Sequence, residues 1–282
     1  MNLRPTVYII LFSLSFLCGC NSVEYSPVQV FDNDSPLNLN ATNLERISKI
    51  KGDDTVRFVL SADFHGSYDN TTDFVKHVNA KIGIDFVILN GDLSDYGLLR
   101  ETEGITKLLT KLNVPFLGVA GNHDLIANGG PAFKRMYGEL NFSFVFDRIK
   151  FVCHDTNSRE YEFNGKVPDL GWLKDEMKPE PGFDHILSVA HVPPSFDLDR
   201  RLEKDYLTLL NSNVLASLYA HKHSAGVFYY TVDNNSYKAV NEGKLDPSKT
   251  SPPSIITGAV VKREYLIVEI INGKIDFEIV NY

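Results

Sequence analysis

Five short apolar runs in this chain each end in a polar cluster, and this repeated pattern limits the folds open to it. The runs cover residues 56–60, 85–89, 115–120, 186–190 and 214–219, and stretches with helical periodicity lie between them at 72–82, 100–112, 170–177 and 202–210. Short apolar runs of this kind are typical of buried strands. Strands that alternate with helices indicate a layered α/β domain.

Two hairpin-like segments complete the expected architecture. Residues 142–146 turn at Asp147 and Arg148 into residues 149–153, and residues 265–271 turn at Asn272 and Gly273 into residues 274–280. Asn-Gly is a favoured pair for a tight two-residue turn. With the alternating runs, the hairpins predict an α/β fold in which two sheets form a β-sandwich flanked by helices.

The clusters after the five runs are rich in carboxylate, imidazole and amide side chains. They contain Asp63 and His65; Asp92 and Asp95; Asn122, His123 and Asp124; His191; and His221 and His223. Ligands of such sheets gather at the carboxyl ends of strands, so we expect the clusters to meet at one edge. Residues two apart in an extended strand end point the same way, so Asp63 and His65 could bind one metal ion together, and His221 and His223 repeat this spacing.

The same clusters offer ligands for a second metal ion. The two carboxylate oxygens of Asp92 could bridge two cations, while Asn122 offers a carbonyl oxygen and His191 an imidazole nitrogen. Two ions roughly 3.5 to 4 Å apart would share a hydroxide, bind phosphate oxygens and offset charge on the attacking and leaving groups. Such mixed ligands accept divalent or mixed-valence manganese, iron, zinc or cobalt, so the metal stays open.

His123 stands beside Asn122 and is free to act as an acid. Asp95 or Asp124 could orient its imidazole. His154 could also line the cleft, and Arg159 and Tyr161 could reach phosphate or a nucleobase. A structural role for His154 and solvated surface for the other two are the simpler interpretations.

The clusters, taken in order, resemble the motifs of the calcineurin-like metallophosphoesterase superfamily: D-x-H, G-D, G-N-H-[D/E], H and G-H-x-H. The resemblance covers roughly residues 56–225. It implies one metal ion on Asp63, His65, Asp92 and His223, a second on Asp92, Asn122, His191 and His221, and a catalytic role for His123. It also implies a four-layer α/β/β/α fold and hydrolysis of phosphomonoesters or phosphodiesters.

Three positions depart from the patterns of this superfamily. Ala220 replaces the glycine that usually precedes the last two histidines, and we expect alanine to be tolerated unless the backbone there has a positive φ. Asp95 stands where purple acid phosphatases carry a metal-binding tyrosine. Tyr96 follows it where the protein phosphatase signature has an arginine. Asp95 argues against the first of these subgroups and Tyr96 against the second.

The first residues have the features of an export signal. Arg4 precedes an apolar stretch at 7–17 that is too short to span a bilayer. Leu17-Cys18-Gly19-Cys20 resembles the lipobox of bacterial lipoproteins, which implies cleavage before Cys20 and a lipid on its sulfur. An ordinary cleaved signal peptide with Cys20 free and an uncleaved anchor are the alternatives. All three place the folded part outside the cytoplasm, in the bacterial cell envelope.

We therefore expect three parts: a lipoprotein signal peptide at 1–19, a lipid-anchored tether at 20–54, and the metallophosphoesterase domain at 55–282. The tether is rich in Asn, Asp, Ser and Pro, as linkers often are. Cys153 ends an apolar run and would have no thiol to pair with once Cys20 carries a lipid, so we expect it to be buried. Loop 128–131, and loop 193–196 with Arg200 and Arg201, could bind the substrate or leaving group or be ordinary connections. The polar run 229–249 could be an insertion or a flap.

Charge restricts the partners further. The net charge of −8 becomes −9 without residues 1–19, because that segment contains Arg4 and no acid. A negative chain repels nucleic acid overall and favours a small phosphoester substrate, with the membrane reached through the N-terminal lipid. The alternative to a hydrolase is a catalytically silent, membrane-anchored binding or scaffold protein on the same fold. The presence of His123 argues against it, because a protein without turnover has no use for an acid.

Overall fold

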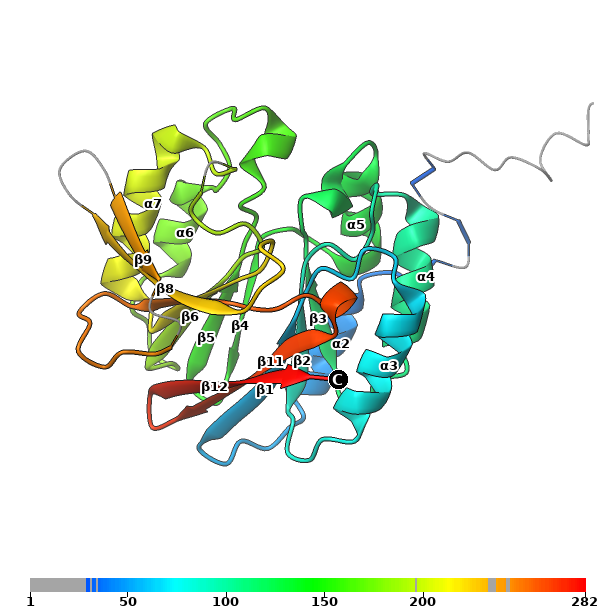
Figure 1. Cartoon of the computed structure of the whole chain (residues 1–282), viewed down its shortest axis with the longest axis horizontal. Helices are drawn as coiled ribbons and strands as arrows, with labels where there is room; N and C mark the ends of the chain where they lie inside the picture. Colours follow the sequence, from blue (N-terminus) through cyan, green and yellow to red (C-terminus); the bar gives the residue numbers. More distant parts are fainter. Residues whose placement is uncertain (1–28, 31, 34, 196, 233–236, 242–243) are drawn as a thin grey trace, which may run out of the picture.

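The computed structural model describes residues 29–282 apart from 31, 34, 196, 233–236 and 242–243, and for 237–241 it describes the backbone alone. The described strands form two sheets that lie face to face, with helices on both outer sides (Figure 1). The first sheet has the order β12-β11-β1-β2-β3, and its strands are β1 (Thr55–Ser61), β2 (Phe86–Asn90), β3 (Phe116–Val119), β11 (Glu264–Ile271) and β12 (Lys274–Asn281). The second has the order β4-β5-β6-β7-β10-β8-β9, and its strands are β4 (Phe142–Phe146), β5 (Ile149–Cys153), β6 (His185–Val189), β7 (Ala216–Tyr219), β8 (Gly226–Val232), β9 (Tyr237–Asn241) and β10 (Pro253–Ile256).

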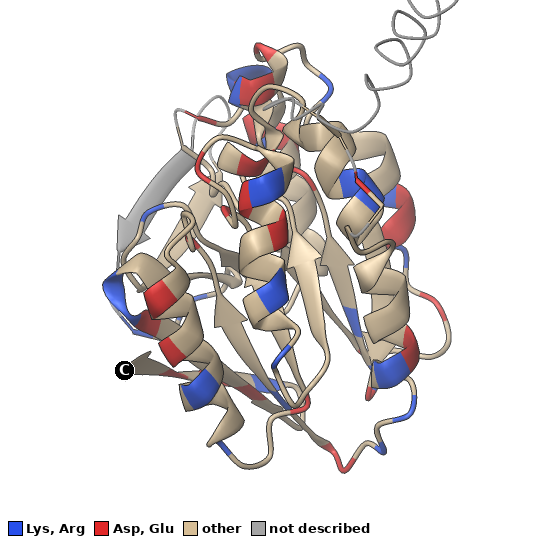
Figure 2. Ribbon diagram, turned by 90° about the vertical axis from the view of Figure 1, so that its right-hand side faces the viewer, with Lys and Arg blue, Asp and Glu red and all other residues tan. Residues whose placement is uncertain are grey.

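Helices cover both outer faces of the sandwich. The first sheet is covered by α3 (Tyr68–Asn79), α4 (Leu99–Leu109) and α5 (Gly129–Tyr137), and the second by α6 (Leu170–Glu176) and α7 (Arg200–Asn213). Figure 2 looks onto the helices of the first sheet, where acidic and basic positions are interspersed along the outer turns. These four layers confirm the expected α/β/β/α sandwich.

The space between the sheets is filled by aromatic side chains from both. Phe58 and Phe86 stack with ring centroids 5.4 Å apart, and Phe151 from the second sheet meets each of them edge-on at 5.5 Å. All three are fully buried. Burial of a side chain of this size stabilises a fold by about 1.5–3 kcal/mol. The close packing holds the two sheets, and so the strand ends, in a fixed relation.

Parallel pairing brings the polar clusters to one edge. β1, β2 and β3 run parallel to one another, as do β5, β6 and β7 in the second sheet. The loops that follow the strands are also bonded together: the Asp63 N–H donates to the Gly91 carbonyl at 3.0 Å, and the Asn90 side chain donates to the Ala190 carbonyl at 2.9 Å. The second bond joins the end of β2 to the end of β6, so it ties the two sheets at the edge that carries the clusters.

Both expected hairpins form. Asp147 and Arg148 have φ of 44° and 63°, and Asn272 and Gly273 have φ of 51° and 71°. Positive φ at both turn residues is typical of the two-residue turns that suit the twist of antiparallel strands. The hairpins β4–β5 and β11–β12 each lie at an outer edge of their sheet.

The expected tether differs from the structure over part of its length. Residues Leu39–Ile47 form helix α2, which lies against the edge strand β3. The Asn40 side chain donates to the Gly118 carbonyl and accepts from the Gly118 N–H, both at 2.8 Å, and Asn43 accepts from the Phe116 N–H at 3.3 Å. Ile47 is 2% exposed. This part of the presumed linker is therefore folded onto the domain.

Two other segments also differ from expectation. The Gly129–Pro131 stretch opens helix α5 rather than forming a free loop, and Pro131 is tolerated there because the first turn of a helix does not need its N–H. The polar run 229–249 supplies parts of β8 and β9, so it extends the second sheet rather than forming a separate flap.

None of the helices in the described part of the chain combines the length and apolar character needed to span a bilayer. The export signal and Cys20 lie outside the described residues. Cys153 is buried, as expected, and its thiol is free.

Candidate metal centre

Five side chains of the polar clusters are attached to strained backbone. The φ angle is 54° at Asp63, 44° at His65, 55° at Asp92, 71° at His221 and 53° at His223. Residues other than glycine rarely adopt such angles, which cost on the order of 1–3 kcal/mol each and tend to gather at functional sites. The expectation that Asp63 and His65 lie on an extended strand end is wrong: they lie in a tight left-handed turn after β1. Ala220 is not among the residues with positive φ, so alanine is tolerated there.

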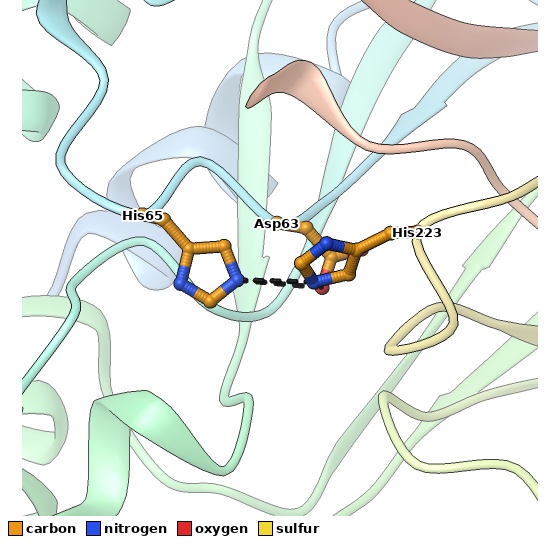
Figure 3. A group of neighbouring side chains, drawn as sticks. All are labelled: Asp63, His65 and His223. Atoms are coloured by element: carbon orange, nitrogen blue, oxygen red, sulfur yellow. Dashed lines mark hydrogen bonds and ion pairs between the residues drawn. The ribbon is translucent and has the colours of Figure 1, made fainter. Parts of the chain in front are cut away.

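Asp63, His65 and His223 form the first group of ligand atoms (Figure 3). Nε2 of His65 lies 3.1 Å from Nε2 of His223, which in turn lies 3.3 Å from Oδ1 of Asp63. Asp63 is fully buried, and its Oδ2 has no hydrogen-bond partner among the described residues. A buried, unpaired carboxylate oxygen is costly unless a cation is near. The group therefore fits a metal ion.

Asp92 connects this group to a second one. Its Oδ2 lies 3.7 Å from Nε2 of His65 and 3.2 Å from Nε2 of His191. Asp92, His191 and His221 have ligand atoms within 4.8 Å of one another, and so do Asp92, His65 and His123. Asp92 thus lies where two neighbouring sites meet, as a bridging ligand requires.

Asn122 joins the second group through its side-chain oxygen. This Oδ1 lies 2.9 Å from Nδ1 of His221. The oxygen and nitrogen donors of Asn122, His191 and His221 together suit a divalent transition metal. The structure thus brings all seven of the expected metal ligands to the same edge of the sandwich.

Backbone carbonyls fix the tautomers of two histidines. Nδ1–H of His191 donates to the Asn90 carbonyl at 2.7 Å, and Nδ1–H of His123 donates to the Asp95 carbonyl at 2.7 Å. A carbonyl can only accept, so in each ring the Nδ1 carries the hydrogen. The Nε2 of His191 is left toward Asp92, and this arrangement is usual for a metal-ligating imidazole.

Neighbouring charges and burial shift the pKa values of the side chains in the cluster. Burial alone would lower the pKa of His191, but the neighbouring Asp92 carboxylate outweighs it and raises the pKa to about 9. Burial works against ionisation of Asp92 as well, yet His191 holds its pKa below the usual range. Burial lowers the pKa of His65, and burial and His191 together lower the pKa of His221. A low pKa favours the neutral imidazole, which is the form that binds metal.

The expected roles of Asp95 and Asp124 need correction. The Asp95 carboxylate faces His65, with 3.2 Å between its Oδ1 and Nδ1 of His65, and it is the Asp95 backbone carbonyl that holds His123. The Asp124 carboxylate accepts from the N–H and O–H of Ser94 and from the Gly121 N–H, each at 3.0 Å. Burial and the charge of Asp92 raise the pKa of Asp124 to about 6. Asp124 therefore ties together the loops after β2 and β3 and does not orient His123.

Gly121 allows the close approach of these two loops. A Cβ at this position would overlap Oδ1 and the backbone nitrogen of Asp92. The same Asp92 Oδ1 accepts from the His123 N–H at 2.9 Å. The glycine thus lets the loop that carries Asn122 and His123 lie directly against Asp92.

Asp197 and Glu160 were not among the expected site residues. Asp197 is 6% exposed, and its Oδ2 lies 3.2 Å from Nε2 of His221. Glu160 lies in the 3₁₀ helix η3 (Ser158–Tyr161). Burial raises the pKa of Glu160, and the charge of His123 opposes this rise only in part. Asp197 precedes the helix-capping Asp199 by two residues, so its only sequence signal is that of another helix cap.

The three residues considered at the cleft have different positions. Arg159, also in η3, is paired with Asp197, with 2.7 Å between Nη2 and Oδ1. The Tyr161 hydroxyl donates to Asp155 at 2.8 Å. His154 is buried, donates through Nδ1–H to the Val152 carbonyl at 3.2 Å, and lies 2.9 Å from the Tyr206 hydroxyl. Arg159 therefore approaches the site, while Tyr161 and His154 have structural contacts.

The sequence model of one family, described as "Calcineurin-like phosphoesterase", matches residues 56–225, more than half of the chain. A protein of Arcobacter nitrofigilis named "Probable glycerophosphodiester phosphodiesterase GpdQ" is 26% identical over 136 residues, which are 44% of this chain and 48% of that protein. The matched part therefore spans about half the length of this relative.

Two solved structures share the fold. The purple acid phosphatase PPD1 from yellow lupin (Lupinus luteus) seeds superposes with a TM-score of 0.60 and 13% identity, over 80% of this chain and 51% of that one. A dimetal phosphatase from Danio rerio superposes with a TM-score of 0.55 and 14% identity, over 80% of this chain and 99% of that one. At such identities the likeness concerns the fold alone.

Proposed function

Because the chain belongs to the calcineurin-like phosphoesterase family, we propose that it hydrolyses small phosphoesters at a two-metal centre outside the cytoplasm. The observation that carries this proposal is the overlap of the three ligand groups. Asp92 belongs to two of them together with histidines from both sheets, so two cation sites adjoin at one carboxylate.

The ligand sets follow from these positions. Asp63, His65, Asp92 and His223 would hold one ion, and Asp92, Asn122, His191 and His221 the other. Bound there, two cations would supply an activated water and offset negative charge on the phosphoryl oxygens. The ion could be manganese, iron or zinc, because the donor set suits all three.

We assign the role of general acid to His123. Its Nδ1–H is held by the Asp95 carbonyl, and its ring meets that of His65 edge-on with centroids 4.8 Å apart. The Nε2 is thus left to carry a proton for the oxygen of the leaving group. A proton donor beside the cations favours a hydrolase over the scaffold alternative, which has no need of one.

Two observations bear on the substrate. The relative in Arcobacter nitrofigilis bears the name of a diesterase, and this supports a phosphodiester as the substrate class here. Arg159 on η3 is paired with Asp197, which in turn contacts His221, so its guanidinium could contact the group attached to the phosphate.

Location is the second part of the proposal. We propose that the chain is a lipoprotein of the bacterial cell envelope, held by a lipid on Cys20. The support is the apolar stretch that ends in Leu17-Cys18-Gly19-Cys20. Replacing Cys20 by Ser should move the protein from the membrane fraction to the soluble fraction or leave an unprocessed precursor. Processing and membrane attachment equal to the wild type would contradict a lipid anchor.

The activity is tested with two chromogenic esters. The full chain in detergent is stripped of metal and assayed on p-nitrophenyl phosphate and bis-p-nitrophenyl phosphate, without metal and with manganese, zinc or iron. Metal-dependent turnover with the diester preferred is the expected result. Two bound ions without turnover of either ester would favour the binding or scaffold protein.

A further inference from the structure

A carboxylate that no family motif includes lies between the proposed metal ligand His221 and an arginine of η3. Oδ2 of Asp197 is 3.2 Å from Nε2 of His221, and Oδ1 is 2.7 Å from the Arg159 guanidinium. Asp197 is nearly buried, with its side chain 9% exposed, whereas the Arg159 side chain is 57% exposed. The three side chains thus form a series of contacts from the exposed Arg159 to the second ligand group.

The ring hydrogen of His221 can be on Nδ1 or on Nε2, and these two tautomers have opposite consequences for a metal ion. Nδ1 faces the Asn122 oxygen at 2.9 Å, and Nε2 faces Asp197. Both partners are acceptors, so in the neutral ring one of the two contacts lacks a hydrogen. If Nε2 carries it, a lone pair on Nδ1 and the Asn122 oxygen point at the same space. A cation placed there would satisfy both atoms.

We propose that Asp197 is a positioning residue that keeps the hydrogen of His221 on Nε2 and so directs Nδ1 at the second metal ion. This inference rests on the metal centre of the proposed function but not on its substrate. A carboxylate is a stronger acceptor than a neutral amide, so Asp197 outcompetes Asn122 for the hydrogen. Carboxylates that contact the outer nitrogen of a metal-ligating histidine commonly fix its tautomer and ring orientation.

Arg159 decides which atom of residue 197 faces His221. The contact at Oδ1 is an ion pair, and a positively charged guanidinium with only N–H groups favours an oxygen over an amide NH₂ there. In an Asp197→Asn variant the amide oxygen would turn to Arg159, and the amide NH₂ would turn to His221. The NH₂ would donate to Nε2 and move the ring hydrogen to Nδ1, where it blocks the metal ion. Asp197→Asn keeps the shape of the side chain, yet it should weaken metal binding because Arg159 orients the amide.

The experiment measures zinc binding by the full chain in detergent, with chelator competition and metal analysis after dialysis. The wild type should bind two ions. Asp197→Asn should bind one of them about 10- to 100-fold more weakly, the range found when an outer partner of a metal-ligating histidine is removed. Adding Arg159→Ala to Asp197→Asn should restore part of the affinity, because the amide is then free to rotate. A purely structural role of Asp197 would give no such recovery.

Asp199 provides the matched control. It is also buried and paired with an arginine, with 2.7 Å between its Oδ2 and Nη2 of Arg201, but it has no contact with an imidazole of the centre. Asp199→Asn should keep both ions at wild-type affinity. Arg159→Ala alone changes an exposed side chain and should not disturb folding. It therefore tests the contact between Arg159 and Asp197 even if Asp197→Asn fails to fold. It should weaken the same ion by a smaller factor than Asp197→Asn.

Two results would overturn the inference. If Asp197→Asn binds both ions with wild-type affinity, Asp197 does not position His221. If Arg159→Ala has no effect and the double variant shows no recovery, Arg159 does not orient residue 197. The result is separable from the proposed function. A protein that binds two zinc ions but cleaves no ester would contradict the hydrolase while the variants still test Asp197.

Discussion

Lowering the pH from 7.5 to 5.0 should weaken the fold through one buried imidazole, His154. The ring is 1% exposed and lies at the end of β5, where Nδ1–H donates to the Val152 carbonyl and Nε2 faces the Tyr206 hydroxyl. Burial lowers the pKa of His154 to about 4, against an ordinary value of 6.5. His154 is not among the groups that could hold a metal ion, so its titration can be followed separately from theirs.

The sign and size of the effect follow from these two pKa values. Below about pH 6.5 the unfolded chain takes up a proton on His154 that the folded chain excludes until about pH 4. The free energy of unfolding therefore falls as the pH falls through this window. The loss from His154 should be about 2 kcal/mol at pH 5.0 and about 3 kcal/mol below pH 4.

Urea unfolding at several pH values measures this loss in the wild type and in His154→Gln. Glutamine keeps an acceptor for the Tyr206 hydroxyl but cannot take up a proton, so the variant should lose about 2 kcal/mol less than the wild type between pH 7.5 and 5.0. The packing cost of the substitution is read at pH 7.5, where His154 is neutral in both states, and is subtracted. Parallel curves for the two proteins would refute the reasoning, because another group would then carry the acid sensitivity.

Two further changes test the metal centre. Asp92→Asn should release at least one of the two ions and abolish ester hydrolysis, because the shared ligand loses its charge; metal analysis showing two ions in the variant would contradict the bridging role. His123→Ala should keep both ions and lower the rate about 10²- to 10⁴-fold, more for an alkyl ester than for an aryl ester with its better leaving group. Equal losses on the two esters would argue against His123 as the acid.

The strands and their clusters could be predicted because each signal is local. A buried strand needs a run of apolar residues, and the polar residue at its end lies within three positions of that run, as Asp63 and His191 do. The fold then brings the clusters together through parallel pairing, a general property of such sheets. The edge at which the candidate ligands meet thus followed from periodicity, order and residue type, whereas their division between two ions came from the family resemblance.

The contacts beyond the ligands could not be predicted, because they depend on pairs far apart in the sequence. Asp197 and His221 are 24 residues apart, and neither neighbourhood indicates the other. Asp95 contacts His123 through its backbone, which no side-chain pattern reveals. The turn that holds Asp63 was likewise expected to be extended, because a left-handed conformation at an aspartate leaves no trace in hydrophobic periodicity.

The two asparagines of α2 occupy backbone groups of an edge strand that would otherwise be open to another chain. Strand β3 ends the first sheet, and an uncovered outer strand can take up a strand from another molecule. Asn40 already occupies both the N–H and the carbonyl of Gly118, and Asn43 occupies the N–H of Phe116. An incoming strand would have to displace a whole helix to reach these groups. Helix α2 therefore blocks the pairing of β3 with a strand of another molecule.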